Sequence, residues 1–356
     1  MPTADAATAR RSRRTCHDAQ GRPDQPALLE IAMRHRSNHA LVFSRLLLVA
    51  ALGLLAGCAH MGSGSATAQL DAFMQQERAW AGLTNHTATL PDGRGMPYSE
   101  GGPANAPTLI LLHGYTGDRN HWNEVARDLT DRWHVIIPDL PGHGGTPLAN
   151  DASADSMAQT LGRFVDAIGA QRYVLVGHSM GGGVAALFAM ARPQQVRGLV
   201  LVDSAGVYAD NPSPVMQAIT QGDNPLAIET AADYQRLLNV AMAKPPFIPD
   251  SIQQALATRA VAHRAAYTQV LDSLLNTQTH LPPSTFHMVL HSLRMPTLVI
   301  WGRKDAIFDV KVTQELEDNL PNATVTVFDD VGHTPIREAP RRTAVAIDGF
   351  VGGLAG

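Results

Sequence analysis

The sequence predicts an α/β protein with a mostly parallel, doubly wound sheet and an inserted helical cap. Short apolar, β-branched runs alternate with helix-like stretches, which is the pattern of parallel strands covered on both faces. One such run leads into the pentapeptide G-H-S-M-G at 177–181, which is typical of a sharp turn from strand to helix. The interval 207–294 holds helical stretches and many prolines but no convincing strand, as expected of a cap over the edge of the sheet where ligands bind. A second, unrelated small domain is the alternative interpretation of that interval.

The first 58 residues are predicted to be a targeting segment rather than part of the fold. Arg34, Arg36 and Arg45 precede an apolar run at 46–57. A basic flank before an apolar run of this length indicates a secretory signal, which is too short for a comfortable membrane span. The run ends in L-A-G-C, which resembles the lipobox of bacterial lipoproteins and implies that Cys58 is lipidated and becomes the mature N-terminus. A plain signal peptide or anchor with an incidental cysteine is the alternative.

Composition and patterning give the domain boundaries. Residues 1–32 are an arginine-rich extension, either untranslated or disordered, and 33–58 are the signal peptide. A small, polar tether (59–70) and a short helix follow within 59–85. The α/β core comprises 86–206 and 295–356, and the helical cap comprises 207–294.

Each strand is predicted where a short, continuously apolar run lies between turn-forming residues. The predicted strands are 108–112, 134–138, 173–176, 198–202, 297–301 and 324–328. Helical patterns predict helices at 71–80 before the core, at 156–168 and 182–191 within it, and at 231–243 and 252–275 in the cap. The chain contains only two cysteines, so no disulfide framework supports this fold.

The charge distribution argues against one class of partner. The net charge is −4, and the first 58 residues contain eight Arg against four Asp or Glu, which gives +4 there and −8 for 59–356. A nucleic-acid-binding protein needs a basic face. We therefore expect no nucleic-acid partner.

Ser179, at the centre of the pentapeptide, is the candidate nucleophile. A serine hydroxyl is a poor nucleophile at neutral pH, and it needs a histidine base that is itself oriented by a carboxylate. In folds with this turn, the acid and then the histidine follow the serine along the chain. Asp305 and His333 fit this order, and each follows a predicted strand, at the sheet edge where Ser179 emerges. Asp203 and Asp309 are the competing acids.

The oxyanion of a tetrahedral intermediate needs two N–H donors that are already in place. We predict that these are the backbone N–H groups of Met180, directly after the nucleophile, and of Tyr115, in the loop after the first parallel strand. In the same loop, His113 is expected to bond the loop backbone beneath the site rather than to act as a base. His178 is expected to point away from the catalytic side.

Two further signals are weaker. His287 and His291, four residues apart on a predicted cap helix, have a spacing that can hold zinc, but no third ligand is evident and a solvated helix face is favoured. The glycine-rich segment 141–145 lacks the lysine of a phosphate-binding loop and is interpreted as a loop bordering the pocket. We therefore predict neither a metal nor a cofactor.

With these residues in place, the segment 91–351 resembles the α/β-hydrolase superfamily, and within it the bacterial family V lipases and related monoacylglycerol lipases. The resemblance implies a carboxylic ester hydrolase that acts on acylglycerols through an acyl-enzyme. Together with the lipobox it implies a membrane-anchored protein of the bacterial cell envelope. Tyr115 and Thr146 depart from the residues usual in this group, which leaves the substrate preference open. The segments that carry the resemblance are 113–115, 139–144, 177–181, 201–206, the surroundings of Asp305 and His333, and 222–226 and 245–249 in the cap.

The same catalytic residues leave other functions open. A C–C bond hydrolase or a thioesterase would use the same acyl-transfer geometry. Haloalkane dehalogenases and epoxide hydrolases are disfavoured, because they use an aspartate nucleophile where this chain has Ser179. A catalytically silent binding module on the cell envelope is the remaining alternative.

Overall fold

The structure, a computed structural model, describes residues 65–356 except 150, 207–211, 281–282 and 355–356. The predicted extension (1–32), the predicted signal peptide (33–58) with Cys58, and the start of the predicted tether lie outside the described residues. Among the helices of the described part, none has the length and apolar character needed to cross a membrane.

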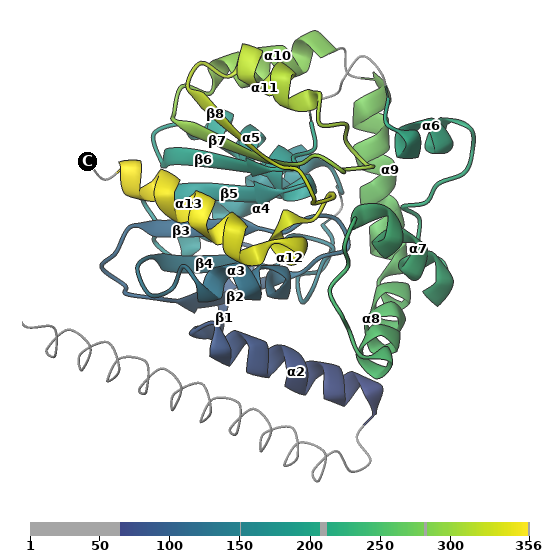
Figure 1. Ribbon diagram of the computed structural model, residues 1–356. Coiled ribbons are helices and arrows are strands. Elements are labelled where there is room, and N and C mark those ends of the chain that lie inside the picture. The colour runs from purple at the N-terminus through teal and green to yellow at the C-terminus, as the bar shows by residue number, and fades with distance from the viewer. Residues whose placement is uncertain (1–64, 150, 207–211, 281–282, 355–356) are drawn as a thin grey trace, which may run out of the picture. The chain divides into compact units, whose positions relative to one another are not determined.

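The centre of the fold is a sheet in which six neighbouring strands are parallel (Figure 1). Two antiparallel strands extend one edge, and the strand order is β1-β2-β4-β3-β5-β6-β7-β8. Every predicted strand is present, with ends that differ by at most two residues. The antiparallel pair is missed by the sequence prediction because neither strand contains a continuous apolar run and both are partly exposed. The strands are β1 (Leu83–Thr89), β2 (Gly95–Gly101), β3 (Thr108–Leu112), β4 (His134–Pro138), β5 (Tyr173–His178), β6 (Val196–Val202), β7 (Thr297–Gly302) and β8 (Ala323–Phe328).

Helices cover both faces of the sheet, which explains why its strands are continuously apolar. In β3, Ile110 and Leu112 face one apolar core and Leu109 and Leu111 face the other, and all four are fully buried. Each such side chain stabilises the fold by about 1.5–3 kcal/mol relative to exposure. The first core is covered by α4 (Ala154–Ala167), α5 (Met180–Ala191) and α11 (Val312–Asn319), and the second by α3 (Asn123–Arg127) and α13 (Pro340–Leu354). The short helices η1 (Arg119–Trp122) and α12 (Pro335–Glu338) precede α3 and α13.

Five helices occupy the described part of the interval between β6 and β7. Figure 1 shows α6–α9 beside one end of the sheet, whereas α10 lies with α11. The single helix predicted at 252–275 is wrong, because the structure has two helices that meet at His263. The His263 N–H donates to the carbonyls of both Arg259 and Ala260, which tightens and ends the first of them. The helices are α6 (Pro214–Thr220), α7 (Ala231–Ala241), α8 (Asp250–Ala262), α9 (Arg264–His280) and α10 (Pro283–Ser292).

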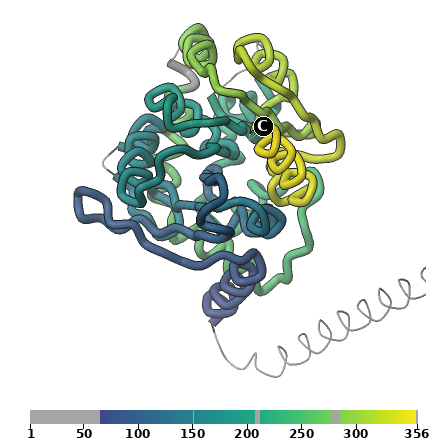
Figure 2. Tube along the Cα trace, turned by 90° about the vertical axis from the view of Figure 1, so that its left-hand side faces the viewer, coloured from purple at the N-terminus to yellow at the C-terminus, as the bar shows by residue number. Residues whose placement is uncertain are grey.

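The first described helix, α2 (Ala66–Trp80), begins five residues earlier than predicted, within the expected tether. The hydroxyl of Ser65 caps it by accepting a hydrogen bond from the N–H of Ala68. The helix lies beside α8 in both views (Figures 1 and 2), and Leu70 is buried there against Ile252. It therefore contacts the cap, although the sequence indicated only a short helix outside the core.

Candidate active site

Ser179 lies on a sharp turn between β5 and α5. Its φ of +52° is in the left-handed region that residues with a side chain rarely adopt. Two glycines make the turn possible. A Cβ on Gly177 would lie 2.3 Å from the carbonyl oxygen of Gly181, and a Cβ on Gly181 would lie 2.5 Å from that of His113. The local sequence therefore dictates the turn that exposes the Ser179 hydroxyl at the edge of the sheet.

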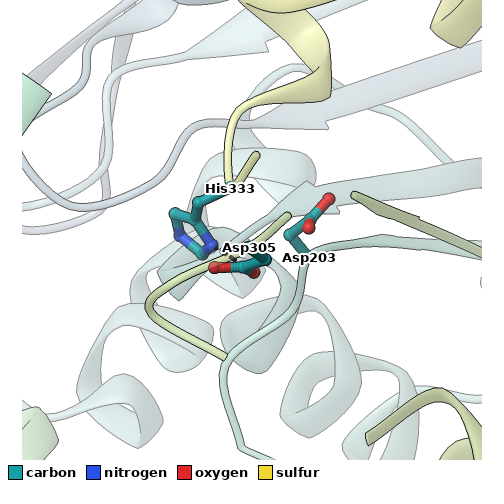
Figure 3. Close-up of side chains that lie close together, drawn as sticks. All are labelled: Asp203, Asp305 and His333. Carbon is teal, nitrogen blue, oxygen red and sulfur yellow. Dashed lines mark hydrogen bonds and ion pairs between the residues drawn. The ribbon is translucent and has the colours of Figure 1, made fainter. Parts of the chain in front are cut away.

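Loops after β7 and β8 bring an acid and a histidine to this hydroxyl. His333 Nε2 lies 2.8 Å from Ser179 Oγ, and His333 Nδ1 lies 2.8 Å from Asp305 Oδ2. Figure 3 shows the carboxyl group of Asp305 beside the ring of His333. Because a carboxylate only accepts, Nδ1 carries the proton and Nε2 is left free to accept the proton of Ser179. Asp309, a competing acid, instead accepts a hydrogen bond from the N–H of Lys311.

Asp305 and His333 are held by backbone groups of their surroundings. Asp305 Oδ1 accepts hydrogen bonds from the N–H groups of Ile307 (2.8 Å) and Phe308 (3.0 Å). The N–H of His333 donates to the carbonyl of Ala241 (2.8 Å), at the end of the cap helix α7. The cap therefore helps to position the histidine as well as covering the site.

The sequence prediction that His178 points away from the catalytic side is wrong. Its ring does not point away from the site: it lines the cavity in front of Ser179, and its Nε2 lies 2.8 Å from the carbonyl oxygen of His333. Because a carbonyl only accepts, Nε2 carries the proton. Burial holds the pKa of His178 well below its usual value, so the ring is neutral. His178 thus fixes the backbone of His333, a role that depends on the turn geometry and that residue spacing does not reveal.

Asp203, the other competing acid, lies beside Asp305 without bonding to His333 (Figure 3). It is fully buried, and its Oδ1 accepts a hydrogen bond from the N–H of Gly302 (2.9 Å). Burial, and then the negative charge of Asp305, raise the pKa of Asp203 well above its usual value. The protonated form is favoured, and in that form Asp203 can donate a hydrogen bond to Asp305.

We expect Asp203→Asn to keep most of the activity. The amide has the shape of a neutral carboxyl group, and it can still accept from Gly302 and donate to Asp305. The value of kcat/KM for ester hydrolysis should therefore fall by no more than about fivefold. A loss as large as that of Asp305→Asn would instead make Asp203 the acid that orients His333.

The same variant should change how stability depends on pH. Because the pKa of Asp203 is raised in the folded state, the folded wild type binds more protons than the unfolded chain once the pH exceeds about 3.9. The stability of the wild type therefore falls as the pH rises. Asp203→Asn has no titrating group at this position, so its stability does not show this fall. The Tm of the variant minus that of the wild type should increase between about pH 4 and pH 7. A constant difference would show that Asp203 has no raised pKa.

The loop after β3 lies directly against the nucleophile. A Cβ on Gly114 would lie 3.0 Å from the Cβ of Ser179, and Tyr115 and Met180 line the same cavity as Ser179. Met180 is the first residue of α5, so its N–H has no partner within the helix. Among the described residues, neither this N–H nor that of Tyr115 donates to another group. Both remain available for the predicted role as oxyanion donors.

His113 fixes this loop, which confirms its predicted structural role. Its Nδ1–H donates to the carbonyl of Gly114 (2.9 Å), and its Nε2 accepts from the N–H of Leu140 (3.0 Å). These two bonds define one neutral tautomer. Burial lowers the pKa of His113 to about 4, so the ring stays neutral.

An apolar cavity of about 150 Å³, here called the catalytic cavity, lies in front of Ser179 and His333. The cap supplies most of its apolar wall, and α2 contributes Met74. The contribution of α2 is not predicted from the sequence, since it depends on how that helix contacts the cap. The apolar lining includes Met216, Leu226, Leu237, Met242, Ile248, Leu271 and Ile307.

Two sets of residues have the composition of a metal site. Ligand atoms of Asp203, Asp305 and His333 lie within 4.8 Å of one another. Hydrogen bonds already engage them, since Nδ1 of His333 bonds Asp305 and the other Asp305 oxygen accepts two N–H groups. His287 and His291 contact α11 instead: His287 Nε2 lies 3.5 Å from a carboxylate oxygen of Glu315, and His291 Nδ1 lies 2.8 Å from a backbone carbonyl. All of these side chains therefore contact protein groups with the atoms that could bind a metal ion.

Comparisons with known proteins agree with this architecture. The family model described as alpha/beta hydrolase fold matches residues 107–340. Lipase 3 of Moraxella sp. (strain TA144) is 30% identical over 318 residues, which cover 88% of this chain and 99% of that protein. A monoacylglycerol lipase of Homo sapiens is 27% identical over 262 residues, which cover 70% of this chain and 77% of that protein. The crystal structure of a membrane phospholipase A, described as a bacterial virulence factor, is 33% identical, with a TM-score of 0.77 and coverage of 90% of this chain and 99% of that chain.

Proposed function

The chain belongs to the α/β-hydrolase family, and from this premise we propose that it is a serine hydrolase that cleaves carboxylic esters of lipids. One observation carries the proposal. Ser179 Oγ, His333 and Asp305 form a continuous hydrogen-bonded chain with two 2.8 Å contacts, in a buried site next to an apolar cavity. This is the arrangement that activates a serine for acyl transfer.

The reaction proceeds in two halves. Ser179 Oγ attacks the ester carbonyl carbon while His333 Nε2 takes its proton, and the N–H groups of Tyr115 and Met180 stabilise the oxyanion. His333 then gives the proton to the leaving alcohol, which leaves an acyl-enzyme on Ser179. A water molecule, deprotonated by His333, attacks that ester, and His333 returns the proton to Ser179 Oγ as the bond to the acyl group breaks and the acid is released. Asp305 holds the ring of His333 and stabilises its charged form in both halves.

Acylglycerols are the proposed substrates. The similarity to a bacterial lipase and to a monoacylglycerol lipase supports this class. The catalytic cavity also fits it, because its Leu, Ile and Met side chains favour an acyl chain over a polar group. The test is hydrolysis of monoacylglycerols by the wild type and by Ser179→Ala, with acyl-CoA and dienone substrates assayed in parallel. A preference for either of those would favour a thioesterase or a C–C bond hydrolase that uses the same residues.

We also propose that the protein acts at the cell envelope, anchored by a lipid on Cys58. The basic flank, the apolar run and the L-A-G-C ending support this anchor, and so does the similarity to a membrane phospholipase A. Cys58 precedes Ala66, the first residue of α2, by eight residues, which can span at most about 28 Å. Since α2 lines the catalytic cavity, such an anchor would keep the cavity close to the membrane surface.

Cys58→Ala is expected to move the protein from the membrane fraction to the soluble fraction. Without the thiol no lipid can be attached, and the short apolar run alone is a poor membrane span. Fractionation followed by immunoblotting measures the shift. Ser63→Ala, at a small residue that follows Cys58 closely and stays in the mature protein, is the control and should leave the distribution unchanged. Membrane retention of Cys58→Ala would count against lipidation.

A further inference from the structure

We propose that a second cavity binds the phosphate-containing headgroup of a lipid whose ester bond is cleaved at Ser179. This polar cavity, of about 410 Å³, lies between α2, the segment 116–121 and the cap helices α8 and α9. The inference rests on the proposed ester hydrolysis and adds the substrate's headgroup class to it. It identifies Arg78, on α2, as the residue that makes the enzyme prefer a lipid with a phosphate-containing headgroup.

The polar cavity adjoins the catalytic cavity. Met74 of α2, Thr116 and Tyr234 line both, so no more than one layer of side chains separates the two. Thr116 directly follows Tyr115, whose N–H is a proposed oxyanion donor. One lipid can therefore occupy both cavities if the shared side chains move aside, with its acyl chain in the catalytic cavity and the rest of its glycerol ester in the polar one.

Arg78 gives this cavity a guanidinium group that forms no ion pair with any described residue. It donates to the neutral amide oxygen of Asn120 (2.5 Å). A second guanidinium, that of Arg119, also lines the cavity and pairs with Asp139. Burial, and then the positive charge of Arg119, lower the pKa of Arg78. The charges of three carboxylates raise it, those of Asp118, Asp139 and Asp71. An anion bound between the two guanidinium groups would be stabilised by both.

Two tyrosine hydroxyls add uncharged donors. Tyr234 and Tyr267 line the cavity and are 7% and 5% exposed, and neither hydroxyl has a hydrogen-bond partner among the described residues. Burial raises the pKa of Tyr234 to about 12, and it also raises that of Tyr267, so both hydroxyls are protonated and can donate. Neither hydroxyl oxygen is among the fully buried polar atoms that lack a partner, so both are accessible to a ligand or to water.

Among the residues that the structure describes, two carboxylates, Asp71 and Asp118, line the cavity together with three guanidinium groups, and only Asp71 of the two is in an ion pair. Asp71 pairs with Arg259 (2.5 Å), and Asp118 accepts a hydrogen bond from the N–H of Asn120 (2.8 Å) as the cap of η1. The glycine-rich segment 141–145 contributes Gly144 and Gly145, but the N–H of Gly145 donates to Asp139. The donors available in the cavity include Arg78 and the tyrosines, and a phosphodiester supplies the acceptor oxygens and the negative charge that match them.

The test compares two substrates with one acyl chain, 1-oleoyl lysophosphatidylglycerol and 1-oleoylglycerol, in the same neutral detergent micelles. The measured ratio is kcat/KM for lysophosphatidylglycerol divided by kcat/KM for 1-oleoylglycerol. We expect Arg78→Gln to lower this ratio about tenfold, which is the size of one lost charge-assisted hydrogen bond. Arg78→Lys, which keeps the charge, should restore the ratio to within about threefold of the wild type. Arg236→Gln, at an exposed arginine on α7, is the matched control and should leave the ratio unchanged. Thermal melting of each variant checks the fold.

A binding measurement keeps this test separate from the proposed function. Titration of lysophosphatidylglycerol into Ser179→Ala, with and without Arg78→Gln, reports the cavity even if no ester is turned over. The proposal would be overturned if Arg78→Gln changed neither the ratio of kcat/KM values nor the binding of lysophosphatidylglycerol. It would also be overturned if Arg78→Lys and Arg78→Gln lowered the ratio equally. Equally tight binding of free glycerol 3-phosphate would also overturn it, since the cavity would then hold a free phosphate ester rather than a lipid headgroup.

Discussion

Replacing Ser179 by alanine is expected to lower kcat for monoacylglycerol hydrolysis about 10⁶-fold, the size of effect seen when a serine nucleophile is removed from such a site. The loss is large because the remaining groups cannot form an acyl-enzyme. His333 and Asp305 should keep their positions, since the alanine methyl group occupies less space than the serine side chain. Initial rates on monoacylglycerol and on a short p-nitrophenyl ester measure the effect.

Ser292→Ala, at an exposed serine on α10, is the matched control and should retain wild-type activity. Labelling with a fluorophosphonate probe gives an independent readout, because the probe reacts only with an activated serine. The wild type and the control should be labelled and Ser179→Ala should not. Near-full activity of Ser179→Ala on short esters would refute the proposed mechanism, and an unlabelled wild type would favour a catalytically silent binding module.

Asp305→Asn is expected to lower kcat about 10⁴-fold while the protein stays folded. An asparagine amide can present its NH₂ group to His333 Nδ1, which favours the tautomer with the proton on Nε2. That proton faces Ser179 Oγ, so His333 can no longer act as a base. The amide also fails to stabilise the imidazolium that forms during the reaction. Single-turnover rates with a p-nitrophenyl ester measure this step directly.

Asp203 provides the comparison for this variant, because it lies beside Asp305 and is equally enclosed. If Asp305→Asn retained substantial activity and the double variant with Asp203→Asn lost it, Asp203 would be able to replace Asp305 as the acid. Retained activity in the double variant as well would show that neither carboxyl group orients His333. We expect the double variant to be no more than severalfold slower than Asp305→Asn alone.

Much of the sheet could be predicted because its signals are local. Parallel strands such as β3 are buried on both faces, so each appears in the sequence as a short continuous apolar run. The antiparallel strands β1 and β2 carry no such run, since most of their residues are exposed or only partly buried and polar residues or glycines interrupt the apolar ones. The helix predicted at 252–275 failed for a related reason: the break at His263 involves neither proline nor glycine and leaves no signal in the pattern.

The turn at Ser179, and the order in which Asp305 and His333 follow it, were predictable from residue spacing alone. Both can be read from the chain, since the turn needs glycines at fixed positions and the ends of parallel strands meet at one edge of the sheet. Three features emerge from the folded chain instead: His178 supports the backbone of His333, burial and Asp305 raise the pKa of Asp203, and α2 brings Arg78 to the cavities. A pKa depends on desolvation and on charges from distant segments, and a side chain's role depends on which segments surround it, so neither is encoded in residue spacing.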